Sequence, residues 1–141
     1  GPVWARHNDC RALVPGSRQF SDDQIRALIA RDAVIGVACD AWMLYPNWIP
    51  GTTTPESADV RIEHCADHID HICQLSGDTR HCAIGSDLDG GYGREQCPRD
   101  LDSIADLQRL AGLLAQRGYS QAAVESILHG NWVRQLMKIL S

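Results

Sequence analysis

Three polar residues with the chemistry of metal binding or proton transfer, His7, Asp40 and Asp87, each stand directly after a short apolar segment. An imidazole or a carboxylate can ligate a metal ion, and either group can carry a proton during catalysis. In parallel α/β folds such residues collect at the carboxyl ends of strands, because these ends open onto one common mouth. The sequence therefore predicts that the three side chains lie at the same edge of a sheet.

Helices alternate with the strands that position these residues. Three buried strands are predicted by apolar runs over residues 2–6, 33–39 and 82–86. Helices are predicted by periodic apolar positions over residues 21–30, 56–75, 101–116, 120–128 and 132–140. Ser21 and Gln24 have the spacing of a capping box for the first helix, and Gly77 is placed to end the second. This order predicts βαβ units, and hence an α/β fold with a parallel sheet covered by helices.

Strand alternation suggests how two of these residues meet. On the first strand Ala5 and His7 share a face, and on the third strand Gly85 and Asp87 do so. The small Gly85 leaves room beside the carboxylate. If both faces line one interior, His7 and Asp87 look into the same mouth. The pattern by itself favours the simpler alternative, in which His7 is a strand-end histidine hydrogen-bonded to a loop.

Length and composition describe an ordinary soluble domain. The 141 residues, 44% hydrophobic and 22% charged, suit a single core. A net charge of −5 with scattered basic residues excludes a polyanion-binding surface, so we expect no nucleic-acid partner. No apolar run approaches the roughly 20 residues of a membrane helix, and the first residues lack the order of a signal peptide. We expect no membrane segment in this chain.

The cysteines favour buried thiols over a disulfide framework. There are six of them, with no C-x-x-C pair. Four lie inside apolar periodic segments, where a free cysteine behaves as a small hydrophobic residue. Disulfides are rare in reducing compartments. A reducing, cytoplasmic compartment therefore fits this usage best.

Five segments, in order and at fitting separations, resemble the membrane dipeptidase family. They are spread over nearly the whole chain, which makes chance agreement improbable. The Gly-Ser-Asp-x-Asp-Gly turn after a strand is the most specific of them. The segments are residues 2–7, Arg11-Ala12-Leu13 followed by Arg18 and Asp22, residues 67–72, residues 85–90, and the Gly130-Asn131 pair.

The resemblance implies a (β/α)8 barrel with two zinc ions bridged by a glutamate and a dipeptide substrate. His7 matches a histidine that ligates one zinc. Arg18, eleven residues further on, matches the arginine that binds the substrate carboxylate, a task suited to the guanidinium fork. Asp87 matches the aspartate beside the metal-bound water, and we expect it to handle a proton as the catalytic residue.

The resemblance also implies that residues 1–141 form a partial barrel domain, about strands 6 to 8 with their helices. A barrel of this kind needs about 250 residues, and a three-stranded parallel sheet leaves two unpaired edges. We therefore expect further strands before residue 1, carrying the bridging glutamate and the remaining zinc ligands. The isolated chain would then be inactive, since His7 supplies one zinc ligand. Arg6 and Asp40 depart from the family pattern, and Asp40 could alter the substrate pocket.

Other polar residues receive structural interpretations. His64, His68 and His71 recur at i, i+4 and i+7, a spacing that can bind metal on a helix. The resemblance places this helix on the outside of the barrel, so packing and hydrogen bonding are favoured. Asp89 precedes Gly90 and favours a role in its own turn.

Two alternative functions stay open. A different metal-dependent amidohydrolase would keep the barrel and the strand-end aspartate, but it would not need Arg18 to bind a carboxylate. A non-catalytic half-barrel would bind a second copy of itself or another chain, and it predicts a stable homodimer.

Overall fold

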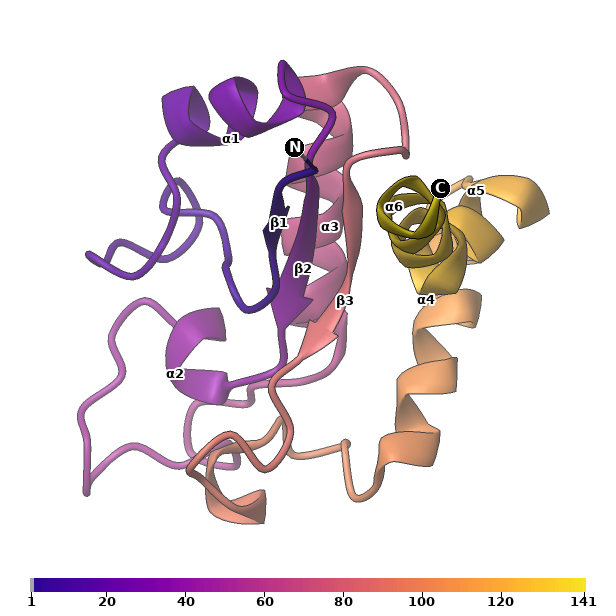
Figure 1. The fold of residues 1–141 in the computed structure, drawn as a ribbon. Helices are drawn as coiled ribbons and strands as arrows, with labels where there is room; N and C mark the ends of the chain where they lie inside the picture. The colour runs from indigo at the N-terminus through magenta and orange to yellow at the C-terminus, as the bar shows by residue number, and fades with distance from the viewer. Residues whose placement is uncertain (1) are drawn as a thin grey trace.

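The computed structural model describes residues 2–141 and shows a three-stranded parallel sheet flanked by helices (Figure 1). The strands are β1 (Trp4–Ala5), β2 (Val34–Ala38) and β3 (Cys82–Ser86), and their order in the sheet is β1-β2-β3. Both neighbouring pairs are parallel. The expected α/β class and all three expected strands are confirmed, although β1 is shorter than its apolar run.

Helices pack against this sheet, and the C-terminal third of the chain consists of helices and the loops that join them (Figure 1). Ser21 caps α1 as expected, because its hydroxyl accepts the Gln24 N–H and the Gln24 side chain accepts the Ser21 N–H. Gly77 ends α3 in the left-handed conformation, with φ 74°. The helical segments are α1 (Asp22–Ile29), α2 (Ala41–Leu44), α3 (Glu63–Ser76), η1 (Arg94–Gln96), η2 (Ile104–Gln108), α4 (Arg109–Gln116), α5 (Gln121–Glu125), η3 (Ser126–Gly130) and α6 (Asn131–Leu140).

Two expected helix starts are wrong. The second helix begins at Glu63 and not at residue 56, because Asp59 adopts a left-handed conformation (φ 49°) that interrupts helical winding. The helix expected from residue 101 begins at Ile104 as a 3-10 turn, and Ile104 is 73% exposed. The short helix α2 was not expected. It forms because the Asp40 carboxylate accepts the Trp42 N–H and caps it.

The two faces of the sheet are covered by different helices. Cys82 of β3 contacts Cys73 of α3, so α3 covers the face that carries Cys82 and its register partner Ile35. Trp132 of α6 lies against the opposite face, where its indole N–H donates to the Ile84 carbonyl (2.9 Å). Figure 1 shows these two helices on either side of the strands.

The alternation expected on β1 is confirmed for Trp4 and Ala5 but does not extend to His7. Ala5 pairs with Ile35 and therefore lies on the α3 face, whereas Trp4 packs against Trp132 with ring centroids 5.9 Å apart. His7 does not continue this alternation, because the chain bends away from the strand directly after Ala5. A bend resets which way the next side chain points, so strand parity does not extend to His7.

A single apolar cluster joins the α3 face of the sheet to helices α1, α3, α4 and α5. All six cysteines are buried free thiols, as their positions in apolar segments predicted. Within residues 2–141, none of the helices has both the length and the apolar character needed to cross a membrane.

Candidate active site

The three polar residues singled out from the sequence all follow the carboxyl ends of strands. His7 comes two residues after β1, Asp40 two residues after β2, and Asp87 directly after β3. Because the strands are parallel and adjacent, these ends lie at one edge of the sheet. The expectation that they share an edge is confirmed.

His7 and Asp87 lie side by side at this edge. The distance from His7 Nδ1 to Asp87 Oδ1 is 3.7 Å, which is too long for a hydrogen bond. His7 Nδ1 is buried and has no hydrogen-bond partner among the described residues. A buried polar atom without a partner is costly and calls for a ligand, a water or an ion. The simpler interpretation of His7, a histidine hydrogen-bonded to a loop through this nitrogen, is therefore not what the structure shows.

Two glycines allow His7 to reach Asp87. The chain after β1 crosses the sheet, and Asn8 N–H donates to the Gly36 carbonyl (3.1 Å). A Cβ at Gly36 would lie 2.7 Å from the Arg6 carbonyl oxygen, and a Cβ at Gly85 would overlap the same oxygen. The space that the sequence suggested beside the carboxylate is thus occupied by the backbone of Arg6. Both positions require glycine because this crossing segment lies directly on the strands.

The turn that carries Asp87 has an unusual backbone. Ser86, Asp87 and Asp89 all adopt positive φ, at 46°, 62° and 64°. Such conformations are uncommon for residues with a side chain and concentrate at functional sites. The Gly90 N–H donates to the Asp87 carbonyl (3.0 Å) and closes the turn. The turn directs Asp87 toward His7, and Asp89 lies exposed in the same turn.

Asp9 is a buried carboxylate at the site that the motifs did not reveal. It is 1% exposed, and its Oδ1 accepts the Ala38 N–H (2.9 Å), where the register between β2 and β3 shifts. Its Oδ2 is buried without a partner among the described residues. Burial raises the pKa of Asp9, the Ala38 hydrogen bond opposes this, and the charges of Asp40 and Asp87 raise it further. The sequence offered one indication of this role, the position of Asp9 two residues after His7. That indication is weak, because a polar residue in a loop is usually exposed.

Asp40 also lies in this acidic environment. Its Oδ1 accepts hydrogen bonds from the Trp42 N–H (3.0 Å) and the Gln96 side-chain amide (2.8 Å). Burial raises the pKa of Asp40, and the nearby charge of Asp87 adds to the effect, while these hydrogen bonds and the charge of Arg18 oppose it. Such a concentration of carboxylates attracts cations to this edge of the sheet.

Arg18 lies near the site on a loop whose base is anchored. Its neighbour Gln19 is buried, donates to the Met43 carbonyl (2.8 Å), and accepts the Asp9 N–H (3.3 Å). The Arg18 side chain itself is exposed, and it makes no ion pair within residues 2–141. Its charge lowers the pKa of Asp40, and the Arg18 carbonyl accepts a hydrogen bond from the Asn8 side-chain amide (3.4 Å), so the loop lies beside the segment that follows His7.

The residues present suit part of a metal site. Within the described chain there is no group of three or more histidine, cysteine, aspartate or glutamate side chains arranged to hold a metal ion. The unpartnered nitrogen of His7 and the unpartnered oxygen of Asp9 are nevertheless donors of the kind that a divalent cation requires. A metal centre at this edge would therefore need ligands from beyond residues 2–141.

The helix histidines have structural roles, as expected. His68 is buried in α3, and its Nδ1 accepts the Cys10 N–H (2.9 Å). Burial, followed by the charges of His71 and His64, lowers the pKa of His68 to about 3, so it stays neutral and can accept. His71 Nε2 lies 2.8 Å from Asp22 Oδ1 and links α3 to α1.

A parallel sheet with a histidine and carboxylates at the carboxyl ends of its strands is the arrangement found in α/β enzymes, whose active sites lie at those strand ends. The model of the membrane dipeptidase family, peptidase family M19, matches residues 1–140. The chain belongs to this family.

Similar proteins cover the chain almost completely. A protein of Klebsiella pneumoniae, described as an uncharacterised protein in the pqqA 5′ region, is 33% identical over 138 residues, which are 98% of this chain and 47% of that protein. An uncharacterised dipeptidase of Schizosaccharomyces pombe is 26% identical over 133 residues, 94% of this chain and 30% of that protein. Human dipeptidase 3 is 25% identical over 98% of this chain and 25% of its own length. The chain thus spans half or less of the length of these relatives.

Solved structures share the fold. A metallopeptidase from Rhodobacter sphaeroides, liganded with a phosphinate mimic of the dipeptide L-Ala-D-Ala, superposes with a TM-score of 0.78 at 22% identity, over 96% of this chain and 36% of that one. An amidohydrolase from Pseudomonas aeruginosa superposes with a TM-score of 0.75 at 21% identity, over 96% of this chain and 45% of that one.

Proposed function

We propose that the complete protein is a zinc-dependent dipeptidase on a (β/α)8 barrel, and that residues 1–141 form the C-terminal part of that domain, about strands 6 to 8 with their helices. The observation that carries this proposal is the His7–Asp87 pair at the strand ends, where an unpartnered ring nitrogen lies 3.7 Å from a carboxylate oxygen. Membership of the membrane dipeptidase family supports the reaction and implies a metal. The substrate class and the identity of the metal are part of the proposal.

His7 is the zinc ligand contributed by this chain. Its free ring nitrogen suits that role, and tight zinc sites use about four ligands, so the others come from the rest of the protein. Zinc, when bound, supplies a Lewis acid and lowers the pKa of a bound water. Residues 1–141 alone should therefore take up zinc weakly and below one equivalent.

Asp87 is the catalytic residue that accepts and returns a proton while the peptide carbonyl is attacked. Its side chain is 18% exposed, so it is shielded but still accessible from the mouth. Its placement on a turn of three left-handed residues fixes the carboxylate toward His7. A positioned carboxylate of this kind is a competent general base.

Arg18 binds the free carboxylate of the dipeptide. Its guanidinium has no ion-pair partner within residues 2–141, and the buried Gln19 anchors the loop beside it. Two parallel hydrogen bonds from a guanidinium recognise a carboxylate specifically. This contact would restrict the enzyme to substrates with a single residue after the scissile bond.

The test uses the complete protein with L-Ala-D-Ala and with the same dipeptide carrying a C-terminal amide. We expect bound zinc, cleavage of the free dipeptide, loss of activity after chelation, and recovery with added zinc. The amide should be cleaved poorly, because it offers Arg18 no carboxylate. A zinc-loaded protein that cleaves both substrates equally would favour the other metal-dependent amidohydrolase, and one that cleaves neither would refute a dipeptidase.

The non-catalytic half-barrel is separated from this proposal by a mass measurement. Exposed apolar side chains on α6, among them Val133, Met137 and Leu140, give that alternative a surface on which a homodimer could form. A native mass of one chain for the complete, active protein would argue against it, and a stable dimer without hydrolase activity would support it.

A further inference from the structure

Two cysteines face each other between α3 and β3, at the edge of the sheet opposite the proposed active site. Cys73 lies in the last turn of α3, and Cys82 is the first residue of β3. Their sulfur atoms are 3.2 Å apart. A disulfide requires about 2.05 Å, so bond formation needs a movement of about 1 Å.

One of these two cysteines lies closer to the protein surface than the other. A cavity of about 290 Å³ opens beside Cys73, which is 7% exposed, whereas Cys82 is fully buried. A small oxidant in this cavity would meet Cys73 first. The cavity is lined by Cys73, Gln74, Gly77, Asp78, Thr79 and Tyr119.

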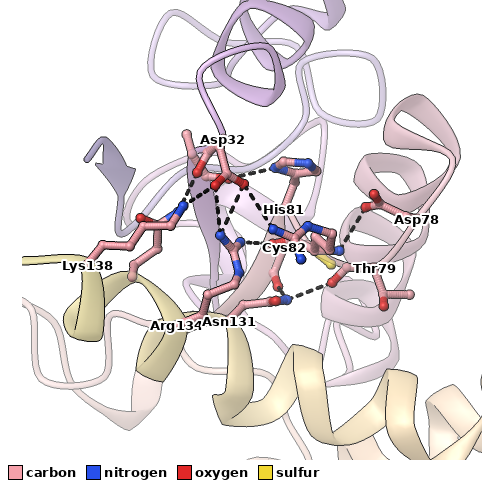
Figure 2. Close-up of polar contacts among 11 residues, drawn as sticks. Asp32, Asp78, Thr79, His81, Cys82, Asn131, Arg134 and Lys138 are labelled. Carbon is pink, nitrogen blue, oxygen red and sulfur yellow. Dashed lines mark hydrogen bonds and ion pairs between the residues drawn. The ribbon is translucent and has the colours of Figure 1, made fainter. Parts of the chain in front are cut away.

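The backbone around Cys82 is held in place from the α6 side. Figure 2 shows the Asn131 side-chain amide reaching the carbonyls of Cys82 and Thr79, at 2.8 and 2.6 Å. On the other side, Gly77 closes α3 by donating its N–H to the Cys73 carbonyl (2.9 Å). Both cysteines are thus anchored by their backbones with the sulfurs turned toward one another.

The pKa values of the two thiols shift in opposite directions, as expected for an attacking and a resolving cysteine. Hydrogen bonding from Cys82 and then from Tyr119 lowers the pKa of Cys73, although burial and the charges of Asp70 and Asp78 oppose this. The hydrogen bond to Cys73 and burial raise the pKa of Cys82. A more acidic, more accessible thiol attacks an oxidant first, and its protonated neighbour resolves the product.

We propose that Cys73 and Cys82 form a peroxide-sensitive dithiol that closes to a disulfide and cross-links the end of α3 to the start of β3. The Cys73 thiolate attacks a peroxide oxygen, so an S–O bond forms, the O–O bond breaks, and the hydroxide that leaves takes a proton to become water. The Cys82 sulfur then attacks the Cys73 sulfenic acid, loses its proton, and releases the second water as the S–S bond forms. Two thiols are oxidised and one hydrogen peroxide is reduced.

The chain contains its own reference pair. The sulfurs of Cys39 and Cys65 are 3.5 Å apart, but these residues are 0% and 1% exposed. Proximity alone would predict similar oxidation of both pairs. Access through the cavity predicts that Cys73 and Cys82 react first.

The test treats the native chain with hydrogen peroxide, alkylates the remaining thiols after denaturation, and maps the peptides by mass spectrometry. We expect a Cys73–Cys82 linked peptide, loss of two thiols from the six, and recovery of both with dithiothreitol. In the reduced native protein, Cys73 should be alkylated at least about tenfold faster than Cys39 or Cys65. Retention of all six thiols, or a Cys39–Cys65 link formed first, would overturn the proposal.

Two variants sharpen this test. In Cys82→Ser, peroxide should leave Cys73 as a sulfenic acid that dimedone traps, because the resolving thiol is gone. Cys65→Ser is the matched control and should still form the Cys73–Cys82 link. Absence of the dimedone adduct in a folded Cys82→Ser protein would remove Cys73 as the attacking thiol, and the wild-type peptide map decides the matter if this variant does not fold.

Discussion

The pKa values of the aspartates shift in opposite directions at the two ends of the parallel sheet. Just before β2, Asp32 is surrounded by cations: Arg134 donates to it at 3.0 Å and Lys138 bonds to it directly (Figure 2). Arg80 lies 3.6 Å from the same carboxylate. The hydrogen bond from Lys138, and then the charges of Arg134, Lys138 and Arg80, lower the pKa of Asp32. At the other end, the pKa values of Asp9 and Asp40 are raised by burial.

This difference suggests a division within one small sheet, with stabilising contacts at the Asp32 end and functional groups at the end that carries His7 and Asp87. The end with satisfied ion pairs ties α6 to the strands, since Arg134 and Lys138 both belong to α6. At the opposite end, His7 Nδ1 and Asp9 Oδ2 are buried without a partner among the described residues, and the carboxylates lack the three cations that surround Asp32. Backbone conformation does not distinguish the two ends, because Asp32 (φ 53°) is left-handed like Asp87 and Asp89. Barrels commonly concentrate functional groups at the carboxyl end of the strands and stabilising contacts at the amino end. Substitutions at the two ends should therefore produce different kinds of defect.

The largest expected effect is at the functional end, from Asp87→Asn in the complete protein. Asparagine is nearly isosteric with aspartate but cannot accept a proton, and it tolerates the left-handed φ of 62°. We expect kcat to fall about 100- to 10,000-fold with little change in KM, as measured by steady-state hydrolysis of a dipeptide.

Asp89→Asn is the matched control in the same turn. Asp89 is exposed and has a similar φ of 64°, so the substitution should leave kcat within a few-fold of wild type. If Asp89→Asn abolished turnover in a folded, zinc-loaded enzyme while Asp87→Asn stayed active, the roles of the two carboxylates would have to be exchanged.

Arg18→Lys should have the next largest effect. An ammonium cannot reproduce the paired hydrogen bonds of the guanidinium, so kcat/KM on a free dipeptide should fall roughly 10- to 100-fold, mainly through KM. Arg26→Lys serves as the control, because Arg26 is an exposed residue of α1 whose ion pair is with Asp23. Equal kinetics for Arg18→Lys and wild type would exclude Arg18 from carboxylate binding.

At the stabilising end, Asn131→Ala should cost stability. Asn131 is 3% exposed and its amide donates to two backbone carbonyls, so alanine leaves these acceptors unsatisfied. We expect a loss of about 2 kcal/mol in the free energy of unfolding of the 141-residue chain, measured by urea denaturation. Val133→Ala, at an exposed position on the same helix, should stay within about 0.5 kcal/mol of wild type. Equal stabilities for these two variants would show that the Asn131 bonds contribute nothing.

The smallest expected effects are on the free energy of unfolding of Asp40→Asn and Asp32→Asn. These two substitutions should change stability in opposite directions at neutral pH. The raised pKa of Asp40 means that its ionised form is disfavoured by folding, so asparagine should stabilise the chain by about 0.5–2 kcal/mol. The asparagine oxygen can still accept the bonds from Trp42 and Gln96. This gain should vanish below the unfolded-state pKa of about 4, where both states are protonated.

For Asp32 the sign is reversed. Its lowered pKa contributes stability above the unfolded-state pKa, and this contribution is lost as the pH falls through the folded-state pKa. The side chain is 40% exposed, so solvent and salt screening keep the loss in Asp32→Asn below about 1 kcal/mol at neutral pH. Urea unfolding of both variants at pH 7 and below pH 4 measures this directly, and changes of the same sign at pH 7 would invalidate the contrast.

The local sequence determined most of the framework. Apolar runs marked all three strands, the Ser21–Gln24 spacing marked a capping box, and Gly77 marked a helix end, because each depends on residues near in sequence. Helix boundaries failed where a single residue left the helical conformation, as Asp59 does. The strand-end positions of His7, Asp40 and Asp87 were also visible, since they follow directly from where the apolar runs stop.

Tertiary structure decided the relations between these elements. The contact between His7 and Asp87 depends on the chain crossing Gly36 and Gly85, which no alternation within β1 could reveal. The burial of Asp9, the surroundings of Asp32, and the facing sulfurs of Cys73 and Cys82 likewise join segments that fold together from separate elements. Sequence patterns report which way a side chain points within its own element. Packing between elements decides which groups surround that side chain, and these neighbours determine its protonation and its reactivity.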